Sequence, residues 1–190
     1  MEKKYTFKSV DKCNMCGAPS DDFIILGKRL NTSQGKNPQD KIGISVTIQQ
    51  CSKCTLIFPN PFPIPNDLQD HYGIPPEDYW VADYFKVDSN YFGGGLEWIK
   101  KLGGEIEGNK ALDIGAGVGH CMHALSNAGY DTYGIEPSVP FYEKAISKMN
   151  IHPSKLVNQQ IEDAEFEENT FSFITYGAVL EHLYDPFLSL

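Results

Sequence analysis

The sequence predicts an α/β protein in which a parallel sheet follows a small cysteine-rich module. Two features predict the sheet. From residue 110 onward, strand-like apolar runs alternate with helical patterns, and a glycine-rich turn joins the first strand to the first helix. Two C-x2-C pairs within the first 54 residues predict the separate module. We therefore expect a metal-binding module at 1–58, a connector at 59–92 and the α/β domain at 93–190.

Turn and capping residues delimit the elements of the α/β domain. Gly93–Gly95 is expected to break the chain, and Ser138 is a suitable N-cap for the helix that follows it. About four parallel strands with right-handed crossovers are expected. We interpret the sequence as a truncated form whose incomplete sheet has an exposed edge that allows self-association. The expected strands are Lys110–Ile114, Thr132–Glu136, Lys155–Asn158 and Phe171–Tyr176, and the expected helices are Leu96–Leu102, Gly119–Ala128, Ser138–Met149 and one from Ala178 onward.

The residues before this domain contain a strand pattern, a proline run and many aromatic side chains. Ile42–Ile48 alternates apolar and polar residues, as in a strand buried on one face. Alternate prolines in Pro59–Pro65 remove amide donors, which excludes a helix or a central strand and predicts a stiff connector. The aromatic residues that follow are expected to pack the two modules together, with a ligand-stacking wall as the alternative. They are Tyr72, Tyr79, Trp80, Tyr84, Phe85, Tyr91 and Phe92.

Composition and charge exclude several classes of protein. The 190 residues are 41% hydrophobic, but they contain no apolar run of the roughly 20 residues that a membrane span needs. Residues 1–12 lack the apolar core of a secretory signal, so we expect a reducing, cytoplasmic location. Residues 1–60 hold nine Lys and Arg against five Asp and Glu, whereas residues 61–190 hold seven against twenty. This acidic second part argues against nucleic acid as a partner.

The two cysteine pairs predict a structural zinc site with the ligands Cys13, Cys16, Cys51 and Cys54. Zinc favours four tetrahedral thiolates, and each C-x2-C turn supplies two of them. The alternatives are disulfides, which an export signal would favour, and a redox pair, which would not explain two pairs. Four protein ligands leave no position for a substrate, so the expected role of the ion is to fold the module.

The segment 111–120, ALDIGAGVGH, is a strand that runs into a glycine-rich turn and then a helix. Gly115, Gly117 and Gly119 allow the backbone to turn tightly and to approach a ligand closely. A dinucleotide fingerprint would need Gly or Ala at the position of His120. Asp113 would repel a pyrophosphate and favour a cationic ligand. The sequence therefore disfavours a nicotinamide oxidoreductase.

The pattern D-x-G-x-G-x-G, followed by the acid Glu136 at the end of the next strand, resembles the class I S-adenosylmethionine-dependent methyltransferases, which have a Rossmann-like sheet. The stretch 171–186 resembles the fourth-strand motif of this family and ends in E-H-x-x-D-P, although Ser172 replaces the usual acid. The resemblance implies that Glu136 grips the ribose hydroxyls of the donor. It implies cofactor contacts from Asp113, Gly115, Gly117, Gly119, Glu136, Asp163 and Tyr176, with Glu162 as the alternative to Asp163.

The front cysteine module is similar to that of a methyltransferase group that includes C-methyltransferases of nucleotide-linked deoxysugars. The resemblance implies methyl transfer to a small-molecule acceptor such as a sugar or sugar nucleotide. His182 is the candidate catalytic base, while its alternative roles are to orient the helix or to bind Glu181. A non-catalytic zinc-ribbon binding protein with a vestigial cofactor domain is the second hypothesis. The remaining histidines are expected to be structural or superficial, namely His71, His120, His123 and His152.

Overall fold

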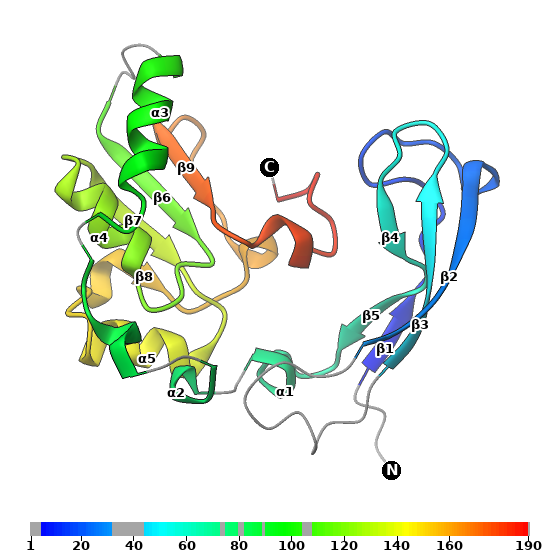
Figure 1. The fold of residues 1–190 in the computed structure, drawn as a ribbon, viewed down its shortest axis with the longest axis horizontal. Coiled ribbons are helices and arrows are strands. Elements are labelled where there is room, and N and C mark those ends of the chain that lie inside the picture. Colours follow the sequence, from blue (N-terminus) through cyan, green and yellow to red (C-terminus); the bar gives the residue numbers. More distant parts are fainter. Residues whose placement is uncertain are drawn as a thin grey trace. The chain divides into compact units, whose positions relative to one another are not determined.

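The computed structural model describes residues 5–31, 44–72, 75–79, 82–88, 90–103 and 108–189. The chain divides into two compact units (Figure 1). Unit 1 comprises Met1–His71 together with Leu183–Leu190, and unit 2 comprises Tyr72–His182. The polypeptide therefore builds unit 1, passes through the whole of unit 2 and returns to unit 1. No helix among the described residues is long and apolar enough to cross a membrane.

Unit 1 contains two small antiparallel sheets. One pairs β1 with β5, and the other has the order β2-β3-β4. Of the strand expected at Ile42–Ile48, residues 42 and 43 lie outside the described part, and the rest extends to Cys51. The elements are β1 (Tyr5–Lys8), a 3-10 turn (Ser20–Asp22), β2 (Phe23–Asn31), β3 (Ile44–Cys51), β4 (Ile57–Pro59), β5 (Phe62–Pro65) and the short helix α1 (Leu68–Tyr72).

The proline run forms edge strands, in agreement with the exclusion of a central strand. Pro59 ends β4 at one edge of the three-stranded sheet, and β5 pairs only with β1 among the described strands. Pro63 and Pro65 lie two residues apart, so their nitrogen atoms face the same side of β5. The amides of Phe62 and Ile64 therefore remain available for the ladder to β1.

Among the described residues of unit 1, one cluster of buried side chains surrounds the cysteines. Its buried members are Val10, Cys13, Cys51 and Phe58. Phe23 packs edge-on against Phe58, with ring centroids 4.9 Å apart. Two of the four buried members are thus thiols, which limits what apolar burial alone contributes to the stability of this unit.

Unit 2 is built on a four-stranded parallel sheet with the order β8-β7-β6-β9, which confirms the predicted parallel α/β architecture (Figure 1). Its strands are β6 (Lys110–Ile114), β7 (Asp131–Ile135), β8 (Leu156–Val157) and β9 (Phe173–Tyr176). Its helices are α2 (Pro76–Tyr79), α3 (Gly93–Gly103), α4 (His120–Asn127) and α5 (Val139–Ser147). The 3-10 turns of this unit are Ala82–Phe85, Pro153–Lys155, Ile161–Asp163 and Leu180–His182.

The central strand β6 is buried along its length after Lys110. Ala111 packs with Leu125 of α4 and Leu96 of α3. Leu112 and Ile114 belong to a second cluster that also contains Ile135 of β7. Both faces of β6 are therefore covered, as in the parallel sheets of α/β proteins.

Two expected elements of unit 2 are wrong. Gly93–Gly95 does not break the chain but forms the first turn of α3, after a turn in which the Gly93 amide donates to the Asn90 carbonyl at 2.9 Å. The helix expected from Ala178 is only the 3-10 turn Leu180–His182, preceded by a positive φ of 58° at Ala178.

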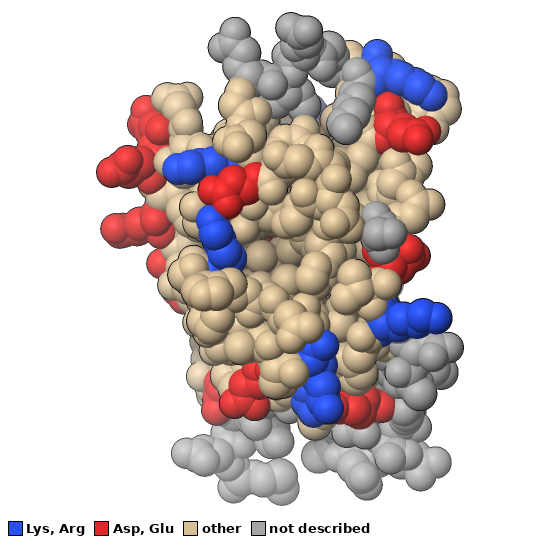
Figure 2. All heavy atoms as spheres, turned by 90° about the vertical axis from the view of Figure 1, so that its left-hand side faces the viewer, with Lys and Arg blue, Asp and Glu red and all other residues tan. Residues whose placement is uncertain are grey.

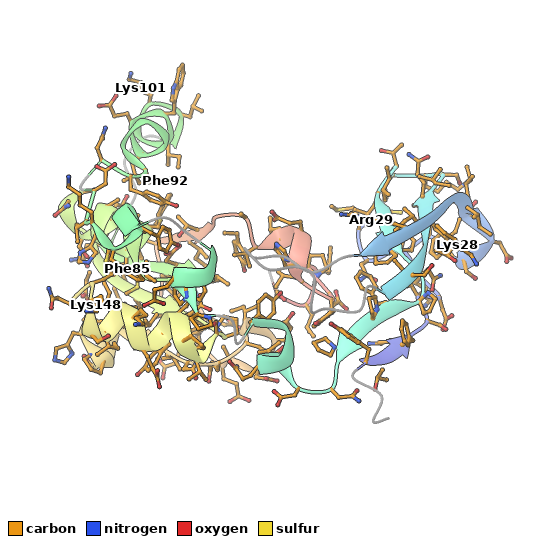
Figure 3. All side chains as sticks on the ribbon, turned by 60° about the horizontal axis from the view of Figure 1, so that its bottom comes forward. Lys28, Arg29, Phe85, Phe92, Lys101 and Lys148 are labelled. Atoms are coloured by element: carbon orange, nitrogen blue, oxygen red, sulfur yellow. The ribbon has the colours of Figure 1, made fainter. Side chains whose placement is uncertain are left out.

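The aromatic residues between the modules pack within unit 2. Tyr84 and Phe85 lie against the cluster that contains Met122 and Met149, and Phe92 lies against the cluster around Leu125. Figure 3 labels Phe85 on the 3-10 turn and Phe92 just before α3. Packing of these three rings therefore stabilises unit 2, whereas the sequence led us to expect a joint between modules. Trp80 lies outside the described residues.

Acidic and basic side chains are mixed on the face shown in Figure 2. They lie mainly towards its rim, and uncharged side chains cover much of its centre. On this face the described residues therefore form no continuous basic surface of the kind that phosphate contacts require.

Candidate functional site

The glycine turn between β6 and α4 needs glycine for both conformation and space. Gly115, Gly117 and Gly119 have φ values of 69°, 57° and 93°, in the left-handed region that other residues rarely adopt. A Cβ atom on Gly115 would lie 2.4 Å from Cγ2 of Val179, and one on Gly119 would lie 2.7 Å from Cγ1 of Ile151. The backbone of this glycine loop is therefore held closely by its neighbours.

Glu136, which directly follows β7, bridges the glycine loop and the start of α5. Its Oε2 atom accepts a hydrogen bond from the amide of Gly117 at 2.6 Å, and its Oε1 atom accepts one from the amide of Ser138 at 2.7 Å. The side chain is buried. Burial raises the pKa of Glu136 to about 7, although the two amides oppose the rise. The structure thus joins the two predicted donor motifs through one carboxylate.

Asp113 is buried in β6 and is bound to the neighbouring strand β9. Thr175 Oγ1 donates to Asp113 Oδ1 at 2.6 Å, and the two residues are register partners in the parallel ladder. Burial raises the pKa of Asp113 to about 6, and the bond from Thr175 only partly offsets this rise. Cys121 Sγ lies 3.7 Å from Thr175 Oγ1.

The acids near the predicted adenine side differ in their placement. Asp163 is exposed, and its Oδ2 accepts a hydrogen bond from Gln160 Nε2 at 3.2 Å. Glu162 is partly buried. Burial raises the pKa of Tyr176, and the charge of Glu162 adds to this rise. Of the two acids, Glu162 is the one whose charge contributes to the raised pKa of Tyr176.

His182 ends the last 3-10 turn and is exposed. Its amide donates to the Val179 carbonyl at 2.8 Å. Its imidazole makes no hydrogen bond to another described residue, so the bond to Glu181 that was one alternative is not formed in the described part of the chain.

The four cysteine Sγ atoms of unit 1 lie within 4.8 Å of one another. Cys13 Sγ is 3.5 Å from Cys54 Sγ, and Cys16 Sγ is 3.6 Å from Cys51 Sγ. A disulfide would need about 2.05 Å. Four thiolates at about 2.3 Å from a tetrahedral zinc ion would be about 3.8 Å apart. The cysteine cluster therefore has the size of a tetrathiolate site.

The two cysteine turns have the same backbone geometry. In the first, the Gly17 amide donates to the Cys13 carbonyl at 2.8 Å, and in the second the Thr55 amide donates to the Cys51 carbonyl at 2.9 Å. Gly17 has a φ of 73° and Thr55 a φ of 65°. Amides of Cys54 and Lys53 bind the Cys51 sulfur and lower the pKa of its thiol to about 7. Such amides stabilise a thiolate, which is the form that binds metal.

Several residues of the site were missed at the sequence level. Thr175 was not assigned a role, because its contact with Asp113 depends on the register between β6 and β9. Ser138 was expected only as an N-cap, which is confirmed by its Oγ atom accepting from the Phe141 amide at 3.5 Å. It also donates to the Tyr72 carbonyl at 2.6 Å, and no sequence pattern indicates that bond.

The second half of the chain matches a known family. Residues 112–190 match the family model described as "Methyltransferase domain". A curated relative, the ubiquinone biosynthesis O-methyltransferase of Bordetella avium strain 197N, is 31% identical over 98 residues, which are 48% of this chain and 39% of that protein. The chain therefore spans about two fifths of the length of this relative. Residues 112–190 are therefore similar to a methyltransferase domain.

Solved structures give weaker matches. Phosphoethanolamine N-methyltransferase 2 of Haemonchus contortus, in complex with S-adenosyl-L-methionine, is 17% identical with a TM-score of 0.42, covering 78% of this chain and 36% of that one. The PH0226 protein of Pyrococcus horikoshii OT3 is 21% identical with a TM-score of 0.35, covering 50% of each chain.

Proposed function

We propose that this protein transfers a methyl group from S-adenosylmethionine to a small-molecule acceptor, and that unit 2 binds the donor at the glycine loop. The observation that carries this proposal is the link between Gly117 and Glu136. The Gly117 amide donates a hydrogen bond of 2.6 Å to the Glu136 carboxylate. This bond brings a glycine loop that a ligand could approach closely next to a carboxylate that could bind hydroxyl groups.

The charges of the site suit this donor. S-adenosylmethionine carries a sulfonium cation, an ammonium group and a ribose diol. Asp113 and Glu136 are two buried acids near the loop. A nearby cation would stabilise the ionised form of each. Glu136 would exchange its backbone partners for the ribose hydroxyls, which are also hydrogen-bond donors. Glu162, with Asp163 as the less favoured alternative, and Tyr176 would lie against the adenine.

The chemical step needs orientation more than it needs protein charge. The acceptor atom attacks the methyl carbon in line with the carbon–sulfur bond, and the electron pair of that bond goes to sulfur. An acceptor that carries a proton must lose it, and we propose that His182 takes that proton. Its exposed position at the carboxyl end of β9 leaves it accessible to an acceptor.

The acceptor is proposed only as a small molecule. The curated relative is named for O-methylation in ubiquinone biosynthesis, which favours an acceptor hydroxyl. The proposal of a sugar or sugar nucleotide as the acceptor rests only on the resemblance of the cysteine module to that of one methyltransferase group.

We also propose that Cys13, Cys16, Cys51 and Cys54 hold one structural zinc ion. Two equivalent turns and sulfur separations of 3.5 and 3.6 Å support this proposal. When bound, zinc supplies a crosslink between β3 and the segment that precedes β2. All four ligands are protein groups, so the ion would have no position for a substrate.

Calorimetry with S-adenosylhomocysteine and with NAD tests the donor assignment. We expect heat from S-adenosylhomocysteine and none from NAD. Glu136→Gln should weaken binding by roughly 10-fold or more, because hydrogen bonds to a charged acceptor are stronger than those to a neutral one. Glu143→Gln, on the exposed side of α5, is the matched control and should bind like the wild type. Heat from NAD but not from S-adenosylhomocysteine would contradict the proposal.

A further inference from the structure

Tyr72 and Tyr84 are held within unit 2 by side chains that adjoin both donor motifs. His120, which directly follows Gly119, has its Nε2 atom 2.5 Å from the Tyr84 carbonyl oxygen. Ser138, two residues after Glu136, donates to the Tyr72 carbonyl at 2.6 Å. The two donor motifs therefore each bind the backbone of one upstream tyrosine.

This attachment brings the ring of Tyr84 to the glycine loop. Its hydroxyl oxygen lies 3.7 Å from the position that a Cβ atom would occupy on Gly117. Burial raises the pKa of Tyr84 to about 12, and the nearby Tyr91 and Glu136 add to the rise. The hydroxyl thus lies beside Gly117, one of the residues that we assign to the donor.

His120 has the surroundings of a fixed, neutral imidazole. Its ring meets Tyr84 edge-on and stacks on Tyr91, each with centroids 4.9 Å apart. A carbonyl oxygen opposite Nε2 requires the proton on that nitrogen, so Nδ1 is unprotonated. Nδ1 is buried and has no hydrogen-bond partner among the described residues. Burial also lowers the pKa of His120.

Burying the unpaired Nδ1 atom of His120 costs free energy. The hydrogen bond from Nε2 to the Tyr84 carbonyl has to offset that cost. An apolar side chain would fill the same space without that cost, but it could not bind the Tyr84 carbonyl. The sequence led us to expect only a structural or superficial role for His120.

We propose that Tyr84 is a donor-binding residue and that His120 is a positioning residue which fixes it over the glycine loop. This inference rests on the proposed function. The Tyr84 hydroxyl hydrogen-bonds a polar group of the adenosyl donor beside Gly117. His120 acts through the Tyr84 carbonyl and does not touch the donor itself.

The test measures the dissociation constant of S-adenosylhomocysteine for single and double variants. Tyr84→Phe removes only the hydroxyl and should weaken binding by about 5- to 20-fold, the loss expected for one hydrogen bond. His120→Leu removes the bond to the carbonyl and should weaken binding by a similar factor. His120→Gln keeps an Nε2 donor and should recover part of this loss. Tyr91→Phe, which keeps the stacked ring, is the matched control and should bind within about 2-fold of the wild type.

A double-mutant cycle separates positioning from general stability. If His120 acts through Tyr84, His120→Leu should change affinity little when Tyr84 is already Phe. Tyr84→Phe should leave the thermal midpoint of the ligand-free protein close to that of the wild type. An unchanged affinity of Tyr84→Phe, or fully multiplicative losses in the double variant, would overturn the inference while leaving the proposed function intact. Failure of the wild type to bind S-adenosylhomocysteine would overturn both.

Discussion

The cysteine turns of unit 1 and the glycine loop of unit 2 both depend on residues with positive φ, but different forces hold them in place. The glycine loop is backed by an apolar cluster that includes Val118, Met122 and Met149, all nearly inaccessible to solvent. The cysteine turns have a core of four buried residues, two of which are the thiols themselves. Packing therefore fixes the loop of unit 2, whereas the zinc ion that we propose for unit 1 would supply much of the stability of the cysteine turns.

Removal of zinc gives the largest expected difference between the units. We expect one zinc ion per chain, and we expect a strong chelator or Cys51→Ser to abolish the dispersed amide resonances of β2, β3 and β4. Resonances of β6 and β7 should persist, because no cysteine ligand lies in unit 2. Zinc analysis and heteronuclear NMR spectra measure both effects.

Cys121→Ser is the control for this experiment. Cys121 lies in α4, outside the cysteine cluster, so the variant should keep one zinc ion. A chelated protein that retains the β2 to β4 resonances would show that zinc does not fold unit 1.

The buried acids of unit 2 should give a pH dependence of intermediate size. Asp113 has a pKa of about 6, above the roughly 3.9 of an unfolded chain. A raised folded-state pKa means that the folded state binds more protons, so this contribution to stability is full below pH 4 and is lost as the pH rises to about 6. Asp113→Asn should therefore stabilise unit 2 at pH 8 by about 1–3 kcal/mol and flatten its profile. Urea unfolding at pH 5 and pH 8 measures both changes.

Asp131→Asn is the control for Asp113→Asn. Asp131 binds Lys155, and this hydrogen bond lowers the pKa of Asp131, so its contribution changes only at more acidic pH. The free energy of unfolding of Asp131→Asn should therefore change with pH as that of the wild type does between pH 5 and pH 8. Equal slopes for wild type and Asp113→Asn would contradict the role of burial at Asp113.

The smallest expected effects concern the equivalent positions of the two cysteine turns. Thr55→Gly should stabilise zinc-loaded unit 1 by about 0.5–1 kcal/mol, because a left-handed φ disfavours threonine. Gly17→Ala should destabilise it by about 1 kcal/mol through backbone strain alone, since nothing lies within 4 Å of the added Cβ. Thermal unfolding in excess zinc compares the variants. Effects of the same sign would show that the two turns are not equivalent.

The sequence predicted those features that depend on local chemistry. Lys110–Ile114 was predicted with its observed bounds because a buried strand that runs into glycines has few alternatives. Ser138 was identified correctly as an N-cap because a short hydroxyl side chain before a helical pattern satisfies a free amide. The spacing of the cysteine pairs likewise predicted which sulfur atoms would come together.

Features that depend on long-range placement could not be predicted in this way. The bond between Thr175 and Asp113 requires the register of two strands that are 62 residues apart in the sequence. The contact of Tyr84 with the glycine loop requires the path of the chain before α3, which no local pattern predicts. Threonine carries no preference for positive φ, so its equivalence to Gly17 was invisible until the backbone geometry was known.

Amide chemical shifts on addition of S-adenosylhomocysteine test the central claim most directly, because the Gly117 and Ser138 amides both donate to Glu136. We predict that these two resonances move in a saturable way, as the ribose hydroxyls displace them from the carboxylate. The amide of Gly129, after the end of α4, should stay in place. Saturable shifts at Gly129 with none at Gly117 and Ser138 would contradict a donor site built on the glycine loop and Glu136.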